Sequence, residues 1–325
     1  MRAMVYTEPG RLELRDVDEP EPDPAEAGVV VDVGAVGICG SDLEGFATRD
    51  PFRVPPLVMG HELAGVRADS GRPVVVNPLV SCLGCDLCLR GRHNLCRSRA
   101  LVGIQRDGGF AERVVVPERN CHPLPDGVSP RHAALVEPLA NASHEFALAQ
   151  AVDPAPERVG VIGAGMLGLA VTLVAVRRGT PAVTVADPQP ARRETARGAG
   201  AHHTGERLDG EFDVIFDAVG TPETRAQSVE RLRPGGTAVW IGLHGQESGV
   251  DGRGLIRNEQ RVLGTFCYLD RDFRAGLRMV AEVCAGLEPD ALPPWVAAHP
   301  LEDGVEVFHS LLDAPPAAAK TLLIP

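Results

Sequence analysis

The stretch that most constrains the fold of this chain runs from Arg158 to Asp187. It begins with an apolar run at 159–162, continues through a glycine-rich turn, G-x-G-x-x-G, at 163–168, and ends in a second apolar run at 182–186. Between the turn and the second run, apolar residues recur at i, i+3, i+4 and i+7: Leu167, Ala170, Val171 and Val174. This spacing predicts an amphipathic helix between two strands, which is one βαβ unit of a parallel sheet.

Each glycine of this turn has a physical task. Gly163 permits the tight turn, Gly165 lets a pyrophosphate approach the backbone, and Gly168 lets the helix pack closely on the strand. The helix begins at Met166 and Leu167, and the unpaired N–H groups of a helix N-terminus bind phosphate. The turn therefore predicts a dinucleotide site.

Asp187 closes the second strand, where an acid accepts hydrogen bonds from the adenosine ribose. Its charge would repel a 2′-phosphate, which favours NAD over NADP, although Arg192 and Arg193 follow closely. Later apolar strands continue the alternation of strands and helices. Because ligands lie at the carboxyl ends of such strands, Val219 and Gly242 are candidates for backbone contact near the nicotinamide.

Four cysteines make the second specific pattern. They follow the spacing Cys-x2-Cys-x2-Cys-x7-Cys and are Cys82, Cys85, Cys88 and Cys96. Four thiolates in so short a span close a tetrahedral shell around Zn²⁺, and a closed shell indicates a structural site. The alternative is a pair of disulfides, which a reducing compartment disfavours.

A second group of metal ligands is spread along the chain. Cys39 lies in a glycine-flanked turn, and His61 and Glu62 follow Gly60. Cysteine, histidine and glutamate are the usual ligands of zinc. Glu137, just before a proline, is either a helix cap or a further ligand.

Composition limits the classes of partner. The chain has 325 residues, 44% of them hydrophobic and 23% charged, and a net charge of −12. That charge argues against nucleic acid and anionic membranes as partners. We find neither a signal peptide nor an apolar run long enough to span a bilayer, so we expect a two-domain cytoplasmic protein.

The motifs together resemble those of the zinc-containing medium-chain dehydrogenase/reductase superfamily, over essentially the whole chain. The chain is most similar to the polyol, sorbitol, threonine and butanediol dehydrogenase branch. The matching stretches are GICGSD (37–42), GHE (60–62), the cysteine lobe (82–96), GGFAERVVVP (108–117), EPLA (137–140), GAGMLG (163–168) and FDAVG (216–220).

This resemblance implies an α/β architecture of two domains. Residues 1–140 and 270–325 would form a β-rich GroES-like catalytic domain, with the structural zinc lobe near 80–98. Residues 141–269 would form a doubly wound Rossmann domain that binds NAD.

The resemblance also assigns roles at the site. Cys39 and His61 would bind a catalytic zinc, and Glu62 or Glu137 would complete its shell with a water. Ser41 matches the hydroxyl that relays the alcohol proton, and Asp42 matches the acid that orients the zinc-binding histidine. Glu44 stands where many relatives have a histidine that passes this proton to solvent.

The implied function is hydride transfer between a secondary alcohol, such as a polyol, cyclitol or sugar, and NAD, with two zinc ions per chain. Relatives assemble as homodimers or homotetramers through the cofactor domain. One alternative is an NAD(P)H reductase without catalytic zinc, against which Cys39 and the Gly-His-Glu motif argue. The other is a non-catalytic nucleotide-binding relative.

Overall fold

The computed structural model describes residues 1–22, 27–245, 247–314 and 317–325. The chain divides into two compact units. Unit 1 combines Met1–Glu137 with Leu277–Pro325, and unit 2 is Pro138–Gly276. Both boundaries fall inside helices, α4 (Val136–Gln150) and α9 (Asp270–Val283).

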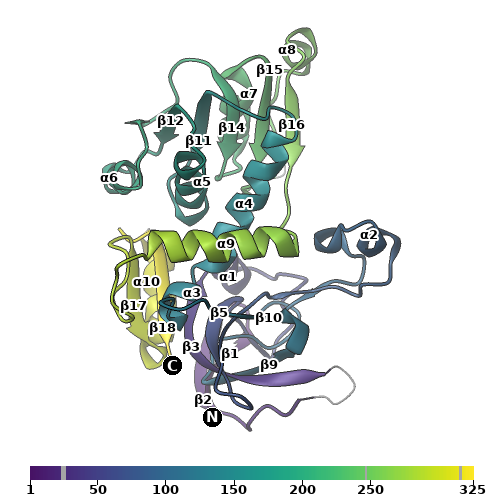
Figure 1. The fold of residues 1–325 in the computed structure, drawn as a ribbon, viewed down its shortest axis with the longest axis vertical. Helices are drawn as coiled ribbons and strands as arrows, with labels where there is room; N and C mark the ends of the chain where they lie inside the picture. The colour runs from purple at the N-terminus through teal and green to yellow at the C-terminus, as the bar shows by residue number, and fades with distance from the viewer. Residues whose placement is uncertain (23–26, 246, 315–316) are drawn as a thin grey trace. The chain divides into compact units, whose positions relative to one another are not determined.

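Unit 2 is built on a six-stranded sheet in the order β13-β12-β11-β14-β15-β16, and all its pairings are parallel (Figure 1). The strands are β11 (Arg158–Ile162), β12 (Ala182–Ala186), β13 (His203–Gly205), β14 (Phe212–Asp217), β15 (Leu232–Trp240) and β16 (Arg261–Gly264). The order reverses between β11 and β14, where doubly wound sheets bind their ligands. β14 is buried along its whole length, as continuous apolar strands in parallel sheets are.

Four helices connect these strands: α5 (Met166–Arg177), α6 (Pro190–Gly198), α7 (Pro222–Glu230) and α8 (Gly252–Arg257). The apolar spacing after the glycine-rich turn predicts α5, but sequence patterning missed α8 and the three-residue strand β13. β13 forms by pairing with β12, and its His203 is exposed. A strand this short has no periodicity of its own to read.

Unit 1 holds a seven-stranded sheet with the path β10-β6-β5-β3-β18-β17, and β9 also pairs with β3. Its strands are β3 (Gly28–Ile38), β5 (Glu62–Arg67), β6 (Pro73–Val76), β9 (Arg113–Pro117), β10 (Cys121–Pro123), β17 (Val296–Pro300) and β18 (Lys320–Ile324). β18 pairs antiparallel with β3, with Leu322 opposite Gly37. The last strand of the chain therefore lies beside the segment that ends at Cys39.

A smaller sheet and three helices complete the core of unit 1. The sheet has the order β2-β1-β4, from β1 (Arg2–Glu8), β2 (Arg11–Asp16) and β4 (Leu57–Val58). The helices are α1 (Gly40–Ala47), α3 (Pro130–Ala133) and α10 (Gly304–Asp313). Phe308 of α10 packs edge-on against Phe46 and Phe110, at ring-centroid distances of 5.8 and 5.5 Å. These contacts join the C-terminal segment to the N-terminal one.

The cysteine lobe is the short segment of unit 1 that contains the four clustered cysteines. A two-stranded ladder of β7 (Leu79–Val80) and β8 (Ala100–Leu101) closes its base. Between these strands the chain forms α2 (Asp86–Leu89) and one 3₁₀ turn at His93–Leu95. Most of its side chains are exposed, so the lobe has little apolar core of its own.

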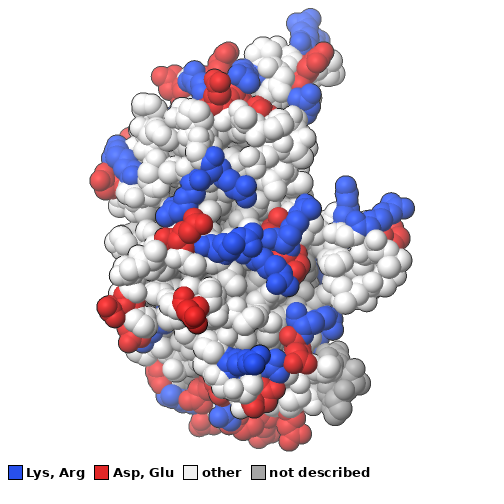
Figure 2. All heavy atoms as spheres, viewed as in Figure 1, with Lys and Arg blue, Asp and Glu red and all other residues white. Residues whose placement is uncertain are grey.

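Figure 2 shows acidic side chains gathered along the lower edge in that view, where Figure 1 places β1 and β2. None of the helices in the described part of the chain combines the length and the apolar character that a membrane span requires.

Candidate active site and metal clusters

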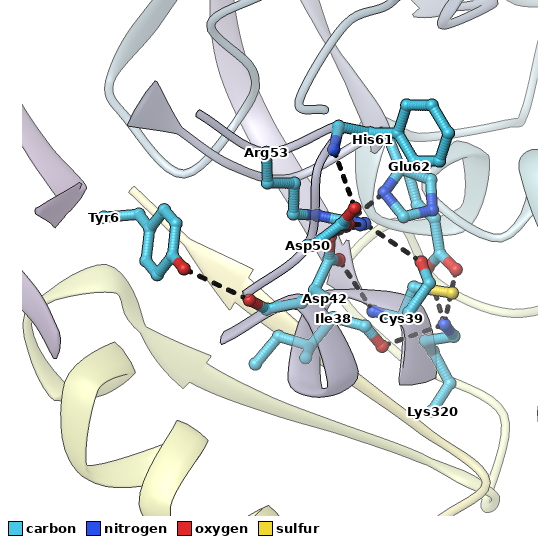
Figure 3. Close-up of polar contacts among 12 residues, drawn as sticks. Tyr6, Ile38, Cys39, Asp42, Asp50, Arg53, His61, Glu62 and Lys320 are labelled. Carbon is cyan, nitrogen blue, oxygen red and sulfur yellow. Dashed lines mark hydrogen bonds and ion pairs between the residues drawn. The ribbon is translucent and has the colours of Figure 1, made fainter. Parts of the chain in front are cut away.

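Unit 1 brings Cys39, His61 and Glu62 together (Figure 3). Cys39 lies between β3 and α1, His61 precedes β5, and Glu62 is the first residue of β5. One ligand atom from each side chain lies within 4.8 Å of the others. Pairing of β3 with β5 sets Gly37 opposite Glu62 and so produces this convergence.

Asp42 contacts two residues of the cluster, His61 and Cys39. Its Oδ1 lies 3.2 Å from His61 Nδ1, and its Oδ2 accepts the Cys39 backbone N–H at 3.1 Å. As the third residue of α1, Asp42 also caps the helix through this second bond. Burial alone would raise the pKa of Asp42, but His61 and Arg53 hold it below its ordinary value. The carboxylate is therefore ionised and lies beside the imidazole.

The same surroundings favour a cation at His61. Burial would lower the pKa of His61, but Asp42 and Cys39 raise it well above its ordinary value. A pocket that stabilises positive charge among a thiol, an imidazole and a carboxylate has the donor set that Zn²⁺ requires. The three residues therefore fit a zinc ion.

Glu62 is held by a lysine that the sequence analysis did not single out. Lys320 Nζ donates to Glu62 Oε1 at 2.7 Å, to Oε2 at 2.6 Å and to the Ile38 carbonyl oxygen at 3.0 Å. Both side chains are buried, and Lys320 is the only lysine in the chain. Burial would lower the pKa of Lys320, but the attraction of Glu62 and Cys39 raises it, so the ammonium group stays charged. The one signal in the sequence was a charged residue at the start of an apolar closing strand.

Glu137 lies apart from this convergence. It is buried in the first turn of α4 and belongs to neither group of metal-ligand atoms found among the described residues. Its charge contributes to the raised pKa of Lys320, so it acts on the same electrostatic environment.

Ser41 and Glu44 both belong to α1, but their environments differ. Ser41 Oγ accepts a hydrogen bond from Arg53 Nη2 at 3.2 Å. Glu44 is exposed. Sequence reasoning missed Arg53, since it stands in a loop without a recognisable motif.

The four cysteines of the lobe also converge. Their sulfur atoms all lie within 4.8 Å of one another, with Cys82 and Cys96 at 3.4 Å. All eight cysteines of the chain are free thiols, so the disulfide alternative is not what the structure contains. Backbone N–H groups of Cys88 and Arg97 lower the pKa of Cys85 to about 6. Such a cluster fits a tetrahedral zinc ion.

Unit 2 contains a cavity of about 450 Å³ at the switch point of its sheet. Four of the predicted cofactor residues line it: Gly163, Asp187, Arg192 and Val219. Gly165, Met166, Leu167 and Gly168 follow in the same turn and begin α5, and Gly242 follows β15.

Asp187 stands at the end of β12, as the sequence predicts. Its Oδ2 accepts the Ala164 N–H at 2.9 Å and its Oδ1 accepts the Gln189 N–H at 2.8 Å. Arg192 Nη1 lies 3.9 Å from the same carboxylate. Each carboxylate oxygen keeps a further lone pair for a ribose hydroxyl.

Comparison with known proteins shows what this combination of folds and clusters is. Residues 25–126 match the family model of the alcohol dehydrogenase GroES-like domain, and residues 167–282 match that of the zinc-binding dehydrogenases. L-galactonate-5-dehydrogenase from Escherichia coli K12 is 31% identical over 312 residues, covering 87% of this chain and 88% of the relative.

Solved structures agree. A zinc-binding dehydrogenase from Sinorhizobium meliloti 1021, bound to NADP, superposes with a TM-score of 0.87 at 29% identity and covers 100% of this chain and 99% of its own. RspB from E. coli CFT073, in complex with NADH, gives a TM-score of 0.88 at 26% identity with the same coverage.

A β-rich unit with a cysteine–histidine–glutamate cluster, joined to a doubly wound dinucleotide unit, defines the class of a zinc-dependent dehydrogenase. The chain belongs to the zinc-containing medium-chain dehydrogenase/reductase family and is an oxidoreductase. The predicted fold class, a GroES-like domain with a Rossmann domain, is confirmed.

Proposed function

We propose that this enzyme transfers hydride between a secondary alcohol, of the polyol or sugar-acid kind, and NAD. The observation that carries the proposal is the group of half-buried Cys39 with buried His61 and Glu62. Ser41 and Asp42 lie on the adjoining helix turn. The resemblance to a dehydrogenase of L-galactonate supports a small polyhydroxylated substrate.

Cys39, His61 and Glu62 would hold the catalytic zinc, which when bound polarises the alcohol oxygen while NAD accepts the hydride. Asp42 keeps His61 in one orientation. Ser41 takes the hydroxyl proton of the alcohol. Glu137 remains the alternative to Glu62 as the third protein ligand, since the Lys320 ion pair engages both oxygens of Glu62. The four cysteines of the lobe would hold a second, structural zinc.

The preference for NAD rests on Asp187. The related structures hold NADP in one case and NADH in the other, so resemblance alone does not choose between them. An ionised carboxylate at the end of β12 would repel a 2′-phosphate and accept a 2′-hydroxyl. We place the enzyme in the cytoplasm as a homodimer or homotetramer, and its eight free thiols agree with a reducing compartment.

The test of the reaction is NADH formation by zinc-loaded protein over a panel of sugar acids, polyols, cyclitols and threonine, with NAD⁺ and with NADP⁺. Cys39→Ala should abolish turnover while NADH still binds, and Cys121→Ala is the matched control outside the cluster. Full activity in Cys39→Ala would refute the assignment of the site. Turnover with NADP⁺ alone would refute the role of Asp187.

Two glycines of the turn separate cofactor binding from folding. A Cβ on Gly165 meets no atom within 4 Å, whereas a Cβ on Gly168 would lie 1.8 Å from the Gly163 carbonyl oxygen. Gly165→Ala should therefore fold normally and lose affinity for NADH, measured by fluorescence titration. Gly168→Ala should lower the melting temperature of the protein itself. Unchanged affinity in a folded Gly165→Ala protein would place the pyrophosphate elsewhere.

A further inference from the structure

A buried arginine, Arg53, contacts Asp42 and Asp50 (Figure 3), and it also contacts Ser41. Arg53, in the loop before β4, is 5% exposed. Its Nη2 donates to Ser41 Oγ and to Asp42 Oδ1, both at 3.2 Å, and its Nη1 donates to Asp50 Oδ2 at 2.5 Å. Burial would lower the pKa of Arg53, but Asp42 and Asp50 raise it, so the guanidinium is charged.

Helix α1 is shaped to admit this side chain. A Cβ on Gly45 would lie 2.6 Å from Arg53 Cδ and 3.0 Å from Arg53 Nε. Glycine inside a helix costs about 1 kcal/mol relative to alanine. Glycine at position 45 therefore makes α1 less stable, but it leaves room for the Arg53 side chain.

The arrangement is not optimised for stability alone. Arg53 Nε is buried without a hydrogen-bond partner among the residues that the structure describes. An unsatisfied buried donor costs about 1–3 kcal/mol. Local costs of this kind are expected where a residue serves a function.

The contact with Ser41 has a direct consequence for proton transfer. A serine hydroxyl has two acceptor lone pairs and one donor hydrogen. The Arg53 N–H occupies one lone pair, which leaves the other to accept a proton and sets the direction of the hydroxyl hydrogen. A guanidinium at 3.2 Å also stabilises partial negative charge on Ser41 Oγ while the protons move.

We propose that Arg53 is a positioning residue for the proton step at Ser41, an inference that rests on the proposed alcohol dehydrogenase function. In alcohol oxidation the hydroxyl proton of the alcohol moves to the free lone pair of Ser41 Oγ, and the hydrogen of Ser41 passes to water. One proton enters the hydroxyl as another leaves, so Ser41 ends neutral and this step changes no oxidation state. Arg53 keeps its own protons and holds Ser41 and Asp42 in one geometry.

The experiment is a double-mutant cycle with Arg53→Met, Ser41→Ala and the combined variant, in zinc-loaded protein with the best alcohol from the panel. Arg49→Met is the matched control, because Arg49 is an exposed arginine of the preceding turn. Zinc per chain and NADH affinity are measured for every variant, beside kcat, KM and the solvent deuterium isotope effect. General acid–base catalysis contributes about 10²–10⁴-fold, and we expect loss of positioning to lower kcat about 10- to 100-fold.

If Arg53 acts through Ser41, Arg53→Met lowers kcat and raises the solvent isotope effect in the wild-type background but has no further effect on Ser41→Ala. Zinc content and NADH affinity stay unchanged. The same loss in both backgrounds, or loss of zinc, would overturn the inference. Should Arg53→Met fail to fold, Arg53→Lys, which keeps the charge and loses the planar fork, gives the same comparison. A wild-type enzyme without turnover would sink the proposed function and this inference together, whereas an active enzyme that tolerates Arg53→Met would sink the inference alone.

Discussion

The ion pair between Lys320 and Glu62 gives the sharpest prediction for stability. The perturbation is Lys320→Met, which keeps most of the side-chain volume and removes the charge. Lys320 is 3% exposed and Glu62 is 1% exposed, so the carboxylate that remains has no access to water. It loses two charge-assisted hydrogen bonds of 2.6 and 2.7 Å, and the Ile38 carbonyl oxygen loses its donor.

The expected magnitude follows from the burial. Removing one partner of a buried ion pair costs about 3–5 kcal/mol, because it leaves an uncompensated charge. At about 2–4 °C per kcal/mol for a large domain, the melting temperature of unit 1 should fall by roughly 6–20 °C. The double variant Lys320→Met with Glu62→Gln should recover much of this loss, since no buried charge remains.

The assay is urea denaturation and calorimetry of the wild type, both single variants and the double variant. Arg113→Met is the control, because Arg113 forms surface ion pairs with Glu19 and Asp32 that are worth little. A coupling energy between Lys320 and Glu62 within about 0.5 kcal/mol of zero, the range of independent sites, would refute the reasoning.

Two further predictions concern the lobe and the cofactor unit. Cys88→Ser removes a buried sulfur of the lobe, so it should reduce zinc from two ions per chain to one and expose the lobe to trypsin at its arginines. Cys121→Ser is the control and should change neither the zinc content nor the cleavage. Two bound zinc ions in Cys88→Ser would contradict the proposed site. Asp272→Asn should destabilise unit 2 by about 1–3 kcal/mol at pH 7, because Asp272 Oδ2 accepts hydrogen bonds from His144 Nδ1 and the Leu269 N–H. Burial would raise the pKa of Asp272, but these bonds lower it. The stabilisation by the Asp272 carboxylate is therefore present above the unfolded pKa of about 3.9 and is lost as the pH falls further. The difference in unfolding free energy between variant and wild type should shrink from pH 7 to about pH 3, and an equal difference at both would contradict the prediction.

Most of the predictions made from the sequence rest on patterns within short stretches of the chain. The cysteine spacing, the glycine-rich turn and the strand periodicities each lie within a few tens of residues, so they could be read before the fold was known. Lys320 and Arg53 could not be found in this way. Lys320 meets Glu62 across 258 residues, because β18 pairs with β3 and β3 pairs with β5. Such a contact depends on the register of two strand pairings, which no single stretch of sequence records.

The choice between Glu62 and Glu137 shows the same limit. Sequence placed both acids near the cluster, through the Gly-His-Glu motif and the residue before Pro138. The contact that shares Glu62 between the cluster and a buried ammonium group forms only in the folded chain. Which acid can bind the metal depends on side-chain geometry, and a sequence motif does not contain that geometry.

The single lysine among the 325 residues is buried beside the candidate metal ligands and can serve as a spectroscopic label. Protein grown on ¹⁵N-lysine would show a single side-chain ammonium resonance, and that resonance would come from the centre of the candidate site. Its chemical shift and its exchange with water would report each change in the occupancy of the cluster without assignment of the rest of the spectrum. Because this lysine is buried, amine-directed reagents should label the folded protein almost solely at its N-terminal amine.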